Sequence, residues 1–378
     1  MKQKCELLIC GDICPTPDTE AFYENGDAKG LFTNIIDLTR EADVTIGNLE
    51  FPLTDIGRGI KKIGPVLKGK RNYIKVLKKA GFNVLGLANN HIRDCGNEGV
   101  ISTLECCIEE NIKSVGAGEN LELARKPLII EQHGWIIGIV AFAEHEFNAA
   151  TKLNAGAYIF DVYYSLKEIQ ELKAKVDYLI VLNHGGIEYY AYPSPLLQTK
   201  CRALIEAGAD FVTCQHSHCI GTEENYKGGR ILYGQGNSLF GYREHNPSWN
   251  EGLLIRLTLD NNKIPIMNVE YIPIEMTNKG AVLASDSRSE VILNAFRERS
   301  KIVVSERDVN KKWDEFCELQ KAVYLPLLFG LGRYITFFNR MFNNAIFRRL
   351  YSKKKLSVTY NLIRCESHNE IIKTILSK

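Results

Sequence analysis

The sequence predicts an α/β fold in which helices alternate with short strands that are buried on both faces. The chain has 378 residues, of which 45% are apolar and 24% charged. This composition is typical of globular proteins, and the length suits either one domain of about 250 residues with an appendage or two domains. Short, continuous apolar runs repeatedly follow helical patterns, as expected for strands covered on both sides. Each of these runs ends in a polar residue able to bind a metal ion.

Five segments share this layout. The first, "CELLICGD", leads to Asp12 without a preceding helix. In each of the others, a predicted helix is followed by Asp or Asn, then an apolar run, then the polar residue. These four segments run from Asp43 to Glu50, from Asn83 to Asn90, from Asp177 to His184 and from Asp210 to His216.

Two glycines mark predicted helix ends. Gly81 and Gly208 each stand two residues before the Asn or Asp that precedes a strand. Glycine is favoured just after a helix because it adopts the left-handed conformation without steric cost. The glycines therefore support the predicted order of helix followed by strand.

The strand ends are expected to meet. In α/β architectures the carboxyl ends of the strands share one edge of the sheet, and sites assemble there. The side chains predicted to gather at this edge are Asp12, Glu50, Asn90, His91, His184, His216 and His218.

These side chains suit a metal centre. Carboxylates, an amide oxygen and imidazoles are a mixed donor set that fits Mn²⁺, Fe²⁺ or Zn²⁺. His216 and His218 are two residues apart, so on an extended strand end both rings would point to one side. Because the set exceeds one tetrahedral shell, it favours two adjacent metal ions, which together can activate water and polarise a phosphoryl or carbonyl oxygen.

The composition also indicates which partners and which cellular compartment to expect. The net charge of +2 gives no indication of nucleic-acid binding. The 11 cysteines lack the spacing of a structural zinc site and are expected to be buried thiols in a reducing compartment. The N-terminal residues do not form a signal-peptide pattern, and no stretch of about 18 apolar residues occurs. We therefore expect a cytoplasmic protein.

An ordered set of motifs over residues 4–275 resembles the CapA family of poly-γ-glutamate capsule biosynthesis proteins, which is related to the calcineurin-like metallophosphoesterases. The motifs are "GD" at Gly11–Asp12, "NLE" at Asn48–Glu50, "ANNHIRDCG" at Ala88–Gly96, "NHGGIEY" at Asn183–Tyr189, "HSH" at His216–His218 and "GQGN" at Gly234–Asn237.

The resemblance implies a fold, a ligand set and roles for the residues. It implies a four-layer α/β/β/α sandwich of the metallophosphoesterase type over residues 1–275. His91 resembles the histidine that protonates the leaving group, and Asp94 would orient it. In the implied dinuclear centre, Asp12 and His218 serve one metal ion, Asn90, His184 and His216 serve the other, and Glu50 bridges them.

Substrate contacts and departures follow from the same resemblance. Glu188 and Asn237 are candidate substrate-binding residues, although Asn237 could instead shape a turn. Cys14 stands where the phosphoesterases have a histidine, and it is either a thiolate ligand or a buried inert thiol. Gly185 replaces a tryptophan that is usual in the family, which would remove a bulky wall from the pocket. The basic segment at 61–71 is either a solvated face or a contact for an anionic substrate.

The C-terminal residues, 276–378, are predicted to form a helical extension. Within them, Leu325–Leu356 holds four Arg, three Lys and no acidic residue, together with many aromatic and aliphatic side chains. This combination suits a helix lying in a membrane interface beside anionic lipids, at the inner face of the membrane. The alternative is a helix packed on the core or on a partner.

The leading functional hypothesis is a CapA-like protein of capsule or poly-γ-glutamate synthesis that performs metal-assisted hydrolysis or transfer on an anionic polymer or a phosphate ester. Other capsule-synthesis proteins are expected partners. A non-catalytic component of a polymer synthesis and export assembly is one alternative. A metallophosphoesterase acting on small molecules is another. The presence of His91 beside a full ligand set favours chemistry, because a binding protein needs no leaving-group acid.

Overall fold

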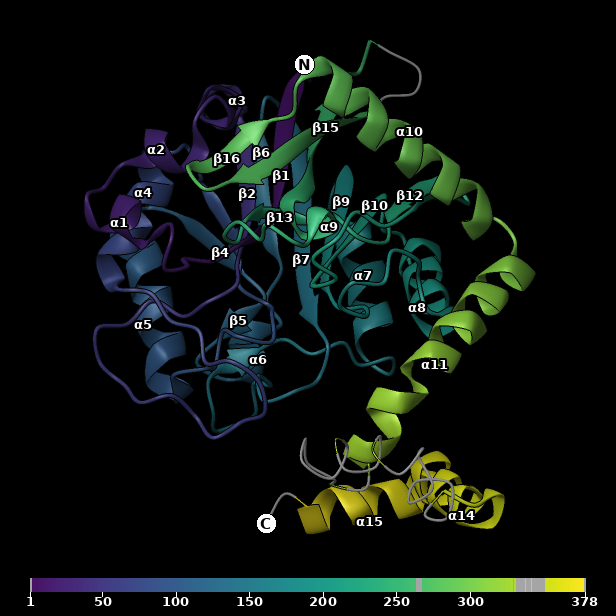
Figure 1. Ribbon diagram of the computed structural model, residues 1–378. Coiled ribbons are helices and arrows are strands. Elements are labelled where there is room, and N and C mark those ends of the chain that lie inside the picture. Colours follow the sequence, from purple (N-terminus) through teal and green to yellow (C-terminus); the bar gives the residue numbers. More distant parts are fainter. Residues whose placement is uncertain are drawn as a thin grey trace. The chain divides into compact units, whose positions relative to one another are not determined.

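The computed structural model describes residues 2–262, 267–328, 330, 337, 341 and 351–376 (Figure 1). The chain divides into two compact units, Met1–Asn310 and Lys311–Lys378. Each is described separately below.

The first unit contains two large sheets. The eight-stranded sheet has a parallel half (β1 to β4), an antiparallel half (β14 to β16) and a short strand, β13, that pairs in parallel with β1. Its order is β16 (Gly280–Leu283), β15 (Met267–Thr277), β14 (Glu251–Leu259), β1 (Cys5–Ile13), β2 (Val44–Leu49), β3 (Val84–Gly86) and β4 (Lys113–Val115), with β13 at Asn237–Leu239.

The second sheet has six strands. Its four central strands are parallel, and an antiparallel strand closes each edge. The order is β11 (Glu223–Tyr226), β12 (Gly229–Leu232), β10 (Phe211–Gln215), β9 (Tyr178–His184), β7 (Trp135–Ala143) and β6 (Leu128–Gln132). A separate two-stranded sheet pairs β5 (Ala117–Gly118) with β8 (Gly156–Ala157).

Helices cover the outer faces of both sheets, which confirms the predicted four-layer α/β/β/α sandwich (Figure 1). Beside the first sheet lie α1 (Glu20–Glu24), α2 (Ala28–Phe32), α3 (Ile35–Glu41), η1 (Arg71–Tyr73), α4 (Ile74–Lys79) and α5 (Gly96–Glu109). Beside the second lie α7 (Ser165–Lys173) and α8 (Pro195–Glu206). The shorter α6 (Leu121–Ala124) and α9 (Pro247–Asn250) lie in connections.

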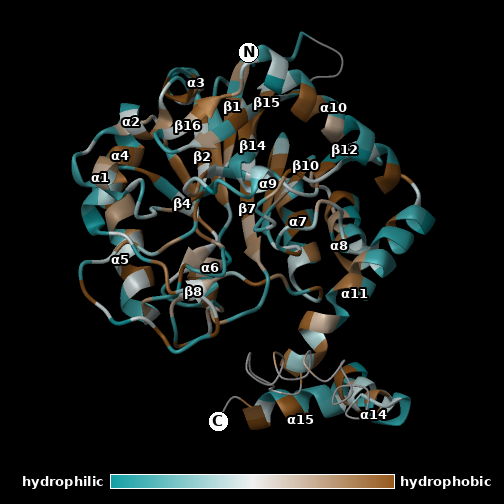
Figure 2. Cartoon of the chain, viewed as in Figure 1, coloured by the Kyte–Doolittle hydropathy of each residue, from teal (hydrophilic) through white to brown (hydrophobic). Residues whose placement is uncertain are grey.

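Apolar side chains fill the spaces between the layers, and Figure 2 shows the strands as the most hydrophobic part of this unit. Ile9 of β1 and Ile180 of β9 belong to one continuous buried cluster that joins the two sheets. On the other face of β9, Val181 packs in a second cluster with Leu204 of α8. All seven residues of β9 are buried, as expected for a strand covered on both sides.

The predicted helix-to-strand order is confirmed. Helices α3, α4, α7 and α8 directly precede β2, β3, β9 and β10. Gly81 and Gly208 have φ angles of +101° and +118°. At Gly208, the amides of Gly208 and Ala209 donate to the carbonyls of Ile205 and Leu204, which is the Schellman arrangement of a helix end.

The first unit extends past residue 275. Helix α10 (Asp286–Val303) lies against β15 and β11, one strand from each large sheet. Its Ile292, Phe296 and Val303 are buried at 3%, 1% and 0% exposure. The helix is therefore part of the sandwich unit, because it covers apolar surface that the sheets would otherwise expose.

The second unit contains most of α11 (Glu306–Leu328), together with α14 (Lys353–Arg364) and α15 (Glu366–Leu376). Neither α14 nor α15 has a buried residue. Among the described residues, no helix has the length and apolar character needed to cross a bilayer. The predicted membrane-interface segment, 325–356, lies largely outside the described residues, so its role stays a prediction.

Candidate metal centre

Parallel strand registers bring the predicted ligands to one place. In the first sheet, Asp12 of β1 lies opposite Asn48 of β2. In the second, His184, the last residue of β9, lies opposite Gln215, the last of β10. Glu50 follows β2 directly, so carboxylates from one sheet and imidazoles from the other meet where the strands end.

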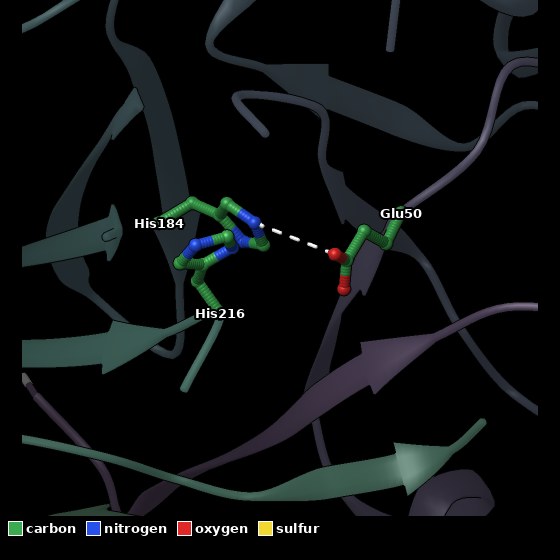
Figure 3. A group of neighbouring side chains, drawn as sticks. All are labelled: Glu50, His184 and His216. Carbon is green, nitrogen blue, oxygen red and sulfur yellow. Dashed lines mark ion pairs between the residues drawn. The ribbon is translucent and has the colours of Figure 1, made fainter. Parts of the chain in front are cut away.

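The ligand atoms form two groups that share Glu50. In one group, ligand atoms of Glu50, His184 and His216 all lie within 4.8 Å of one another (Figure 3). In the other, the same holds for Asp12, Glu50 and His218. Asn90 belongs beside the first group, because its Oδ1 lies 3.0 Å from His184 Nε2.

Glu50 is the most unusual group in the centre. Its side chain is fully buried, and neither carboxylate oxygen has a hydrogen-bond partner within the described chain. Burial, reinforced by the charge of nearby Asp12, raises the pKa of Glu50 well above its usual range. A buried carboxylate without hydrogen-bond partners is costly unless a cation compensates it. The residues present therefore fit metal binding at Glu50.

The imidazoles are in the form that binds metal. Burial lowers the pKa of His216 to about 4 and that of His218 to about 3, and it lowers the pKa of His184 well below its usual range. At neutral pH all three rings are consequently uncharged and offer a lone pair. His216 Nδ1 is buried without a hydrogen-bond partner in the described chain.

Neighbouring amides orient the ligands. Asn48 donates to Asp12 Oδ1 at 2.7 Å, and its Nδ2 lies 3.2 Å from His184 Nδ1. His184 Nε2 lies 3.0 Å from Asn90 Oδ1 and 3.5 Å from Glu50 Oε1. Asn48 was not among the predicted site residues, although it is part of the "NLE" motif.

Asn237 occupies a different place from the one predicted. Its Oδ1 lies 2.8 Å from His218 Nδ1, and its Nδ2 donates to the Trp249 carbonyl at 2.9 Å. The side chain is fully buried, and it does not line the cavity described below. These contacts favour a residue that holds the His218 ring, with Nε2 left for a metal ion, over a substrate-binding residue.

The two histidines of "HSH" are brought together by a turn. Strand β10 ends at Gln215, before both histidines. The prediction that they lie on an extended strand end is therefore wrong. His216 and His218 have φ angles of +89° and +52°, a region that residues other than glycine seldom adopt. Such strain is typical of functional sites. Their ring centroids lie 6.1 Å apart.

His91 lies beside the ligands in a network with two charged groups. His91 Nδ1 is 2.7 Å from Asp94 Oδ2, in agreement with the predicted contact between these residues. Lys62 Nζ donates to the other oxygen of Asp94. The Asn89 Oδ1 accepts from the His91 amide at 3.1 Å and its Nδ2 donates to the Leu49 carbonyl, so Asn89 shapes the turn.

A cavity of about 590 Å³ opens at this centre. Asn90, His91 and His218 line it, together with Glu188. The predicted substrate residue Glu188 is thus on the cavity wall. Lys62 and Arg243 also line the cavity, and Arg243 was not singled out from the sequence.

Two departures from the family pattern have structural counterparts. Burial raises the pKa of Cys14 well above its usual range, so the thiol is neutral, and it donates to the Pro15 carbonyl. These properties favour an inert thiol over a ligand. At Gly185, a Cβ atom would lie 2.5 Å from Glu144 Oε1. The side chain of Glu144 therefore occupies the space next to Gly185.

Comparison with known proteins supports the resemblance found in the motifs. The family model described as bacterial capsule synthesis protein PGA_cap matches residues 6–242. The chain is 27% identical to the capsule biosynthesis protein CapA of Bacillus anthracis, over 79% of this chain and 74% of that protein. It is 32% identical to the PGA biosynthesis protein CapA of Bacillus subtilis (strain 168), over 61% of this chain and 62% of that protein.

Solved structures with detectable similarity are more distant. A hypothetical protein from Thermus thermophilus aligns with a TM-score of 0.46 and 14% identity, over 71% of this chain and 99% of that one. A phosphatase from Mycoplasma pneumoniae aligns with a TM-score of 0.43 and 16% identity, over 77% of this chain and 98% of that one.

The family match covers more than half of the chain and includes every strand end that contributes to the centre. The chain therefore belongs to the bacterial capsule synthesis protein family PGA_cap.

Proposed function

We propose that this protein acts in the synthesis of a capsule polymer such as poly-γ-glutamate, and that it catalyses metal-assisted hydrolysis or transfer on an anionic substrate. The capsule role is inferred from the family and from the names of the Bacillus relatives. The chemistry is inferred from the centre. The observation that supports it most directly is the buried Glu50 carboxylate, which lacks hydrogen-bond partners in the described chain and is shared by two groups of ligand atoms.

The ligand groups suit two divalent ions. Asp12 and His218 would hold one, His184, His216 and Asn90 the other, and Glu50 both. The mixed nitrogen and oxygen donors fit Mn²⁺, Fe²⁺ or Zn²⁺. When bound, such a pair supplies an activated water and polarises the oxygen of a phosphoryl or carbonyl group.

His91 is the proposed proton donor to the leaving group. It lines the cavity next to Asn90, and the carboxylate of Asp94 accepts from its Nδ1–H. This bond fixes the ring and leaves Nε2 for the substrate. Asp94 acts through His91 and is therefore a positioning residue.

The proposal is tested with metal analysis of the purified protein and turnover of a phosphodiester and of poly-γ-glutamate. His91→Ala is expected to keep its metal content and to lose turnover by about 10²- to 10⁴-fold, the usual contribution of a general acid. His368→Ala is the matched control, because His368 is an exposed histidine outside the first unit. Its turnover is expected to equal that of the wild type.

Two outcomes would contradict the proposal. A protein that holds no transition metal and turns over neither substrate after Mn²⁺ is added is not a metal-dependent hydrolase. A protein that holds metal but has no turnover would instead favour a binding component of a polymer synthesis assembly.

A further inference from the structure

We propose that Arg243 determines substrate specificity by binding a second anionic group of the substrate, apart from the group that reacts. This inference rests on the proposed function and names one feature of its substrate, an oxyanion such as a carboxylate or phosphate located beyond the reacting group. Arg243 lines the same cavity as Asn90, His91 and His218, so a ligand bound at the centre can reach it.

The guanidinium is held in place before any substrate arrives. Its Cζ lies 3.2 Å from the ring centroid of Trp249, and Nη1 donates to the Tyr189 hydroxyl at 3.0 Å. The backbone of Arg243 is fixed as well, because the Asn250 side chain accepts from its amide and donates to its carbonyl. Such pre-organisation reduces the entropy lost on binding.

The aromatic support of Arg243 continues to the metal ligands. The Trp249 ring packs against His218 with centroids 4.5 Å apart, and its indole NH donates to the Gly241 carbonyl. The Trp249 carbonyl in turn holds Asn237, the partner of His218. Trp249 therefore connects the position of Arg243 to the centre.

Arg243 is the cation in this cavity that is available to a substrate. Lys62 also lines the cavity, but its ammonium is paired with the buried Asp94 carboxylate. Within the described residues, Arg243 forms no ion pair with a carboxylate. A planar guanidinium stacked on an aromatic ring presents its remaining N–H groups in a fork that matches carboxylate and phosphate oxygens.

The carboxylates of the cavity sharpen the expected specificity. Glu146 and Glu188 line it together with Arg243. They would repel a carboxylate or phosphate placed next to them, whereas a neutral linker between two anionic groups is tolerated there. We therefore expect a substrate whose anionic groups are separated, with one at the metal centre and one at Arg243.

The test measures binding rather than turnover, with Mn²⁺-loaded protein and isothermal titration calorimetry. Two matched probe pairs distinguish the sources of the second anion. One pair is a trimer of γ-linked glutamate and the same trimer with its α-carboxylates converted to amides. The other pair is pyrophosphate and inorganic phosphate. The variants are Arg243→Gln and Arg243→Lys, with Arg297→Gln, an exposed arginine of α10, as the control.

Arg243→Gln is expected to weaken binding of the unamidated trimer, of pyrophosphate or of both by about 10- to 100-fold, the effect of losing a charge-assisted hydrogen bond. Binding of the other member and the Mn²⁺ content are expected to stay unchanged. The affinity of Arg243→Lys is expected to lie between those of the wild type and Arg243→Gln, because lysine keeps the positive charge but lacks the forked N–H groups of the guanidinium. The pair that responds identifies the anion as carboxylate or phosphate.

Equal losses for both members of each pair, or no loss, would overturn this proposal alone. A wild-type protein that holds no Mn²⁺ would overturn the proposed function, and this proposal with it.

Discussion

At the scale of single residues, Glu50 is the group whose environment most strongly favours a bound cation. It is fully buried, close to Asp12, and has no hydrogen-bond partner among the described residues. An ionised carboxylate in such a place destabilises the fold unless a cation binds it. Glu50 is therefore expected to lower the stability of the metal-free protein and to raise its affinity for metal.

The substitution Glu50→Gln tests both effects. In the metal-free protein we expect the free energy of unfolding at pH 7 to rise by about 1–3 kcal/mol, because a neutral amide replaces a buried carboxyl that must either take up a proton on folding or stay charged without a cation. In the wild type, Mn²⁺ at 100 times its Kd should add about 2.7 kcal/mol. Glu50→Gln should lose most of that gain.

The measurement is denaturant unfolding at pH 7 with and without Mn²⁺. Glu119→Gln, at an exposed glutamate, is the control for the chemical change. A metal-free Glu50→Gln protein that is less stable than the wild type would show that Glu50 has a structural partner and would contradict the bridging role.

At the scale of elements, the connection between β2 and η1 is organised by one carboxylate. Asp94 pairs with Lys62, its Oδ2 accepts from the Leu67 amide at 2.7 Å, and its carbonyl accepts from the Ile60 amide at 2.9 Å. The same connection contributes Lys62–Pro65 to the cavity wall. Asp94 thus links the position of this wall to the ring of His91.

Lys62→Met should release the connection. The Lys62 and Asp94 side chains are 2% and 0% exposed, and removing one partner of a buried pair usually costs about 3–5 kcal/mol. We expect faster amide exchange and proteolysis at residues 56–69. The metal content should be unchanged.

Lys61→Met is the matched control, because Lys61 is the neighbouring lysine and is exposed. If amide exchange and proteolysis at residues 56–69 are equally slow in both variants, the Lys62–Asp94 pair does not hold the connection.

At the scale of the whole molecule, α10 decides where the sandwich ends. Arg299 donates to the carbonyls of Ile220 and Gly221, and Gln198 of α8 donates to the Val303 carbonyl. Together with the buried Ile292 and Phe296, these contacts attach the helix to the first unit. The predicted division at 275 and 276 falls before this helix, whereas the compact unit ends at Asn310.

Two truncations test this boundary. A fragment of residues 1–310 is expected to unfold cooperatively with the denaturation midpoint of the same unit in the full chain. A fragment of residues 1–275 should be less stable or fail to fold, since it exposes the apolar surface under α10. Phe296→Ala in the full chain should cost about 3–5 kcal/mol. Equal midpoints for the two fragments would place the boundary at 275.

The sequence by itself determined the order of helices and strands, the helix ends at Gly81 and Gly208, and the set of polar residues at the strand ends. These features depend on local periodicity and on backbone preferences, which neighbouring residues encode. The family could also be identified at this stage, because its motifs occur in order along the chain. The extent of the first unit could not, because α10 looks like any amphipathic helix until its partners are known.

Only the tertiary structure decided how the site residues act. The His216 amide donates to Asp12 across 204 residues of sequence, Asn237 holds His218 instead of lining the cavity, and Asp94 neutralises Lys62. Arg243 has no recognisable motif and gains its place through stacking on Trp249. A side chain's role in a buried centre depends on which distant groups are packed against it, and no local pattern records those contacts.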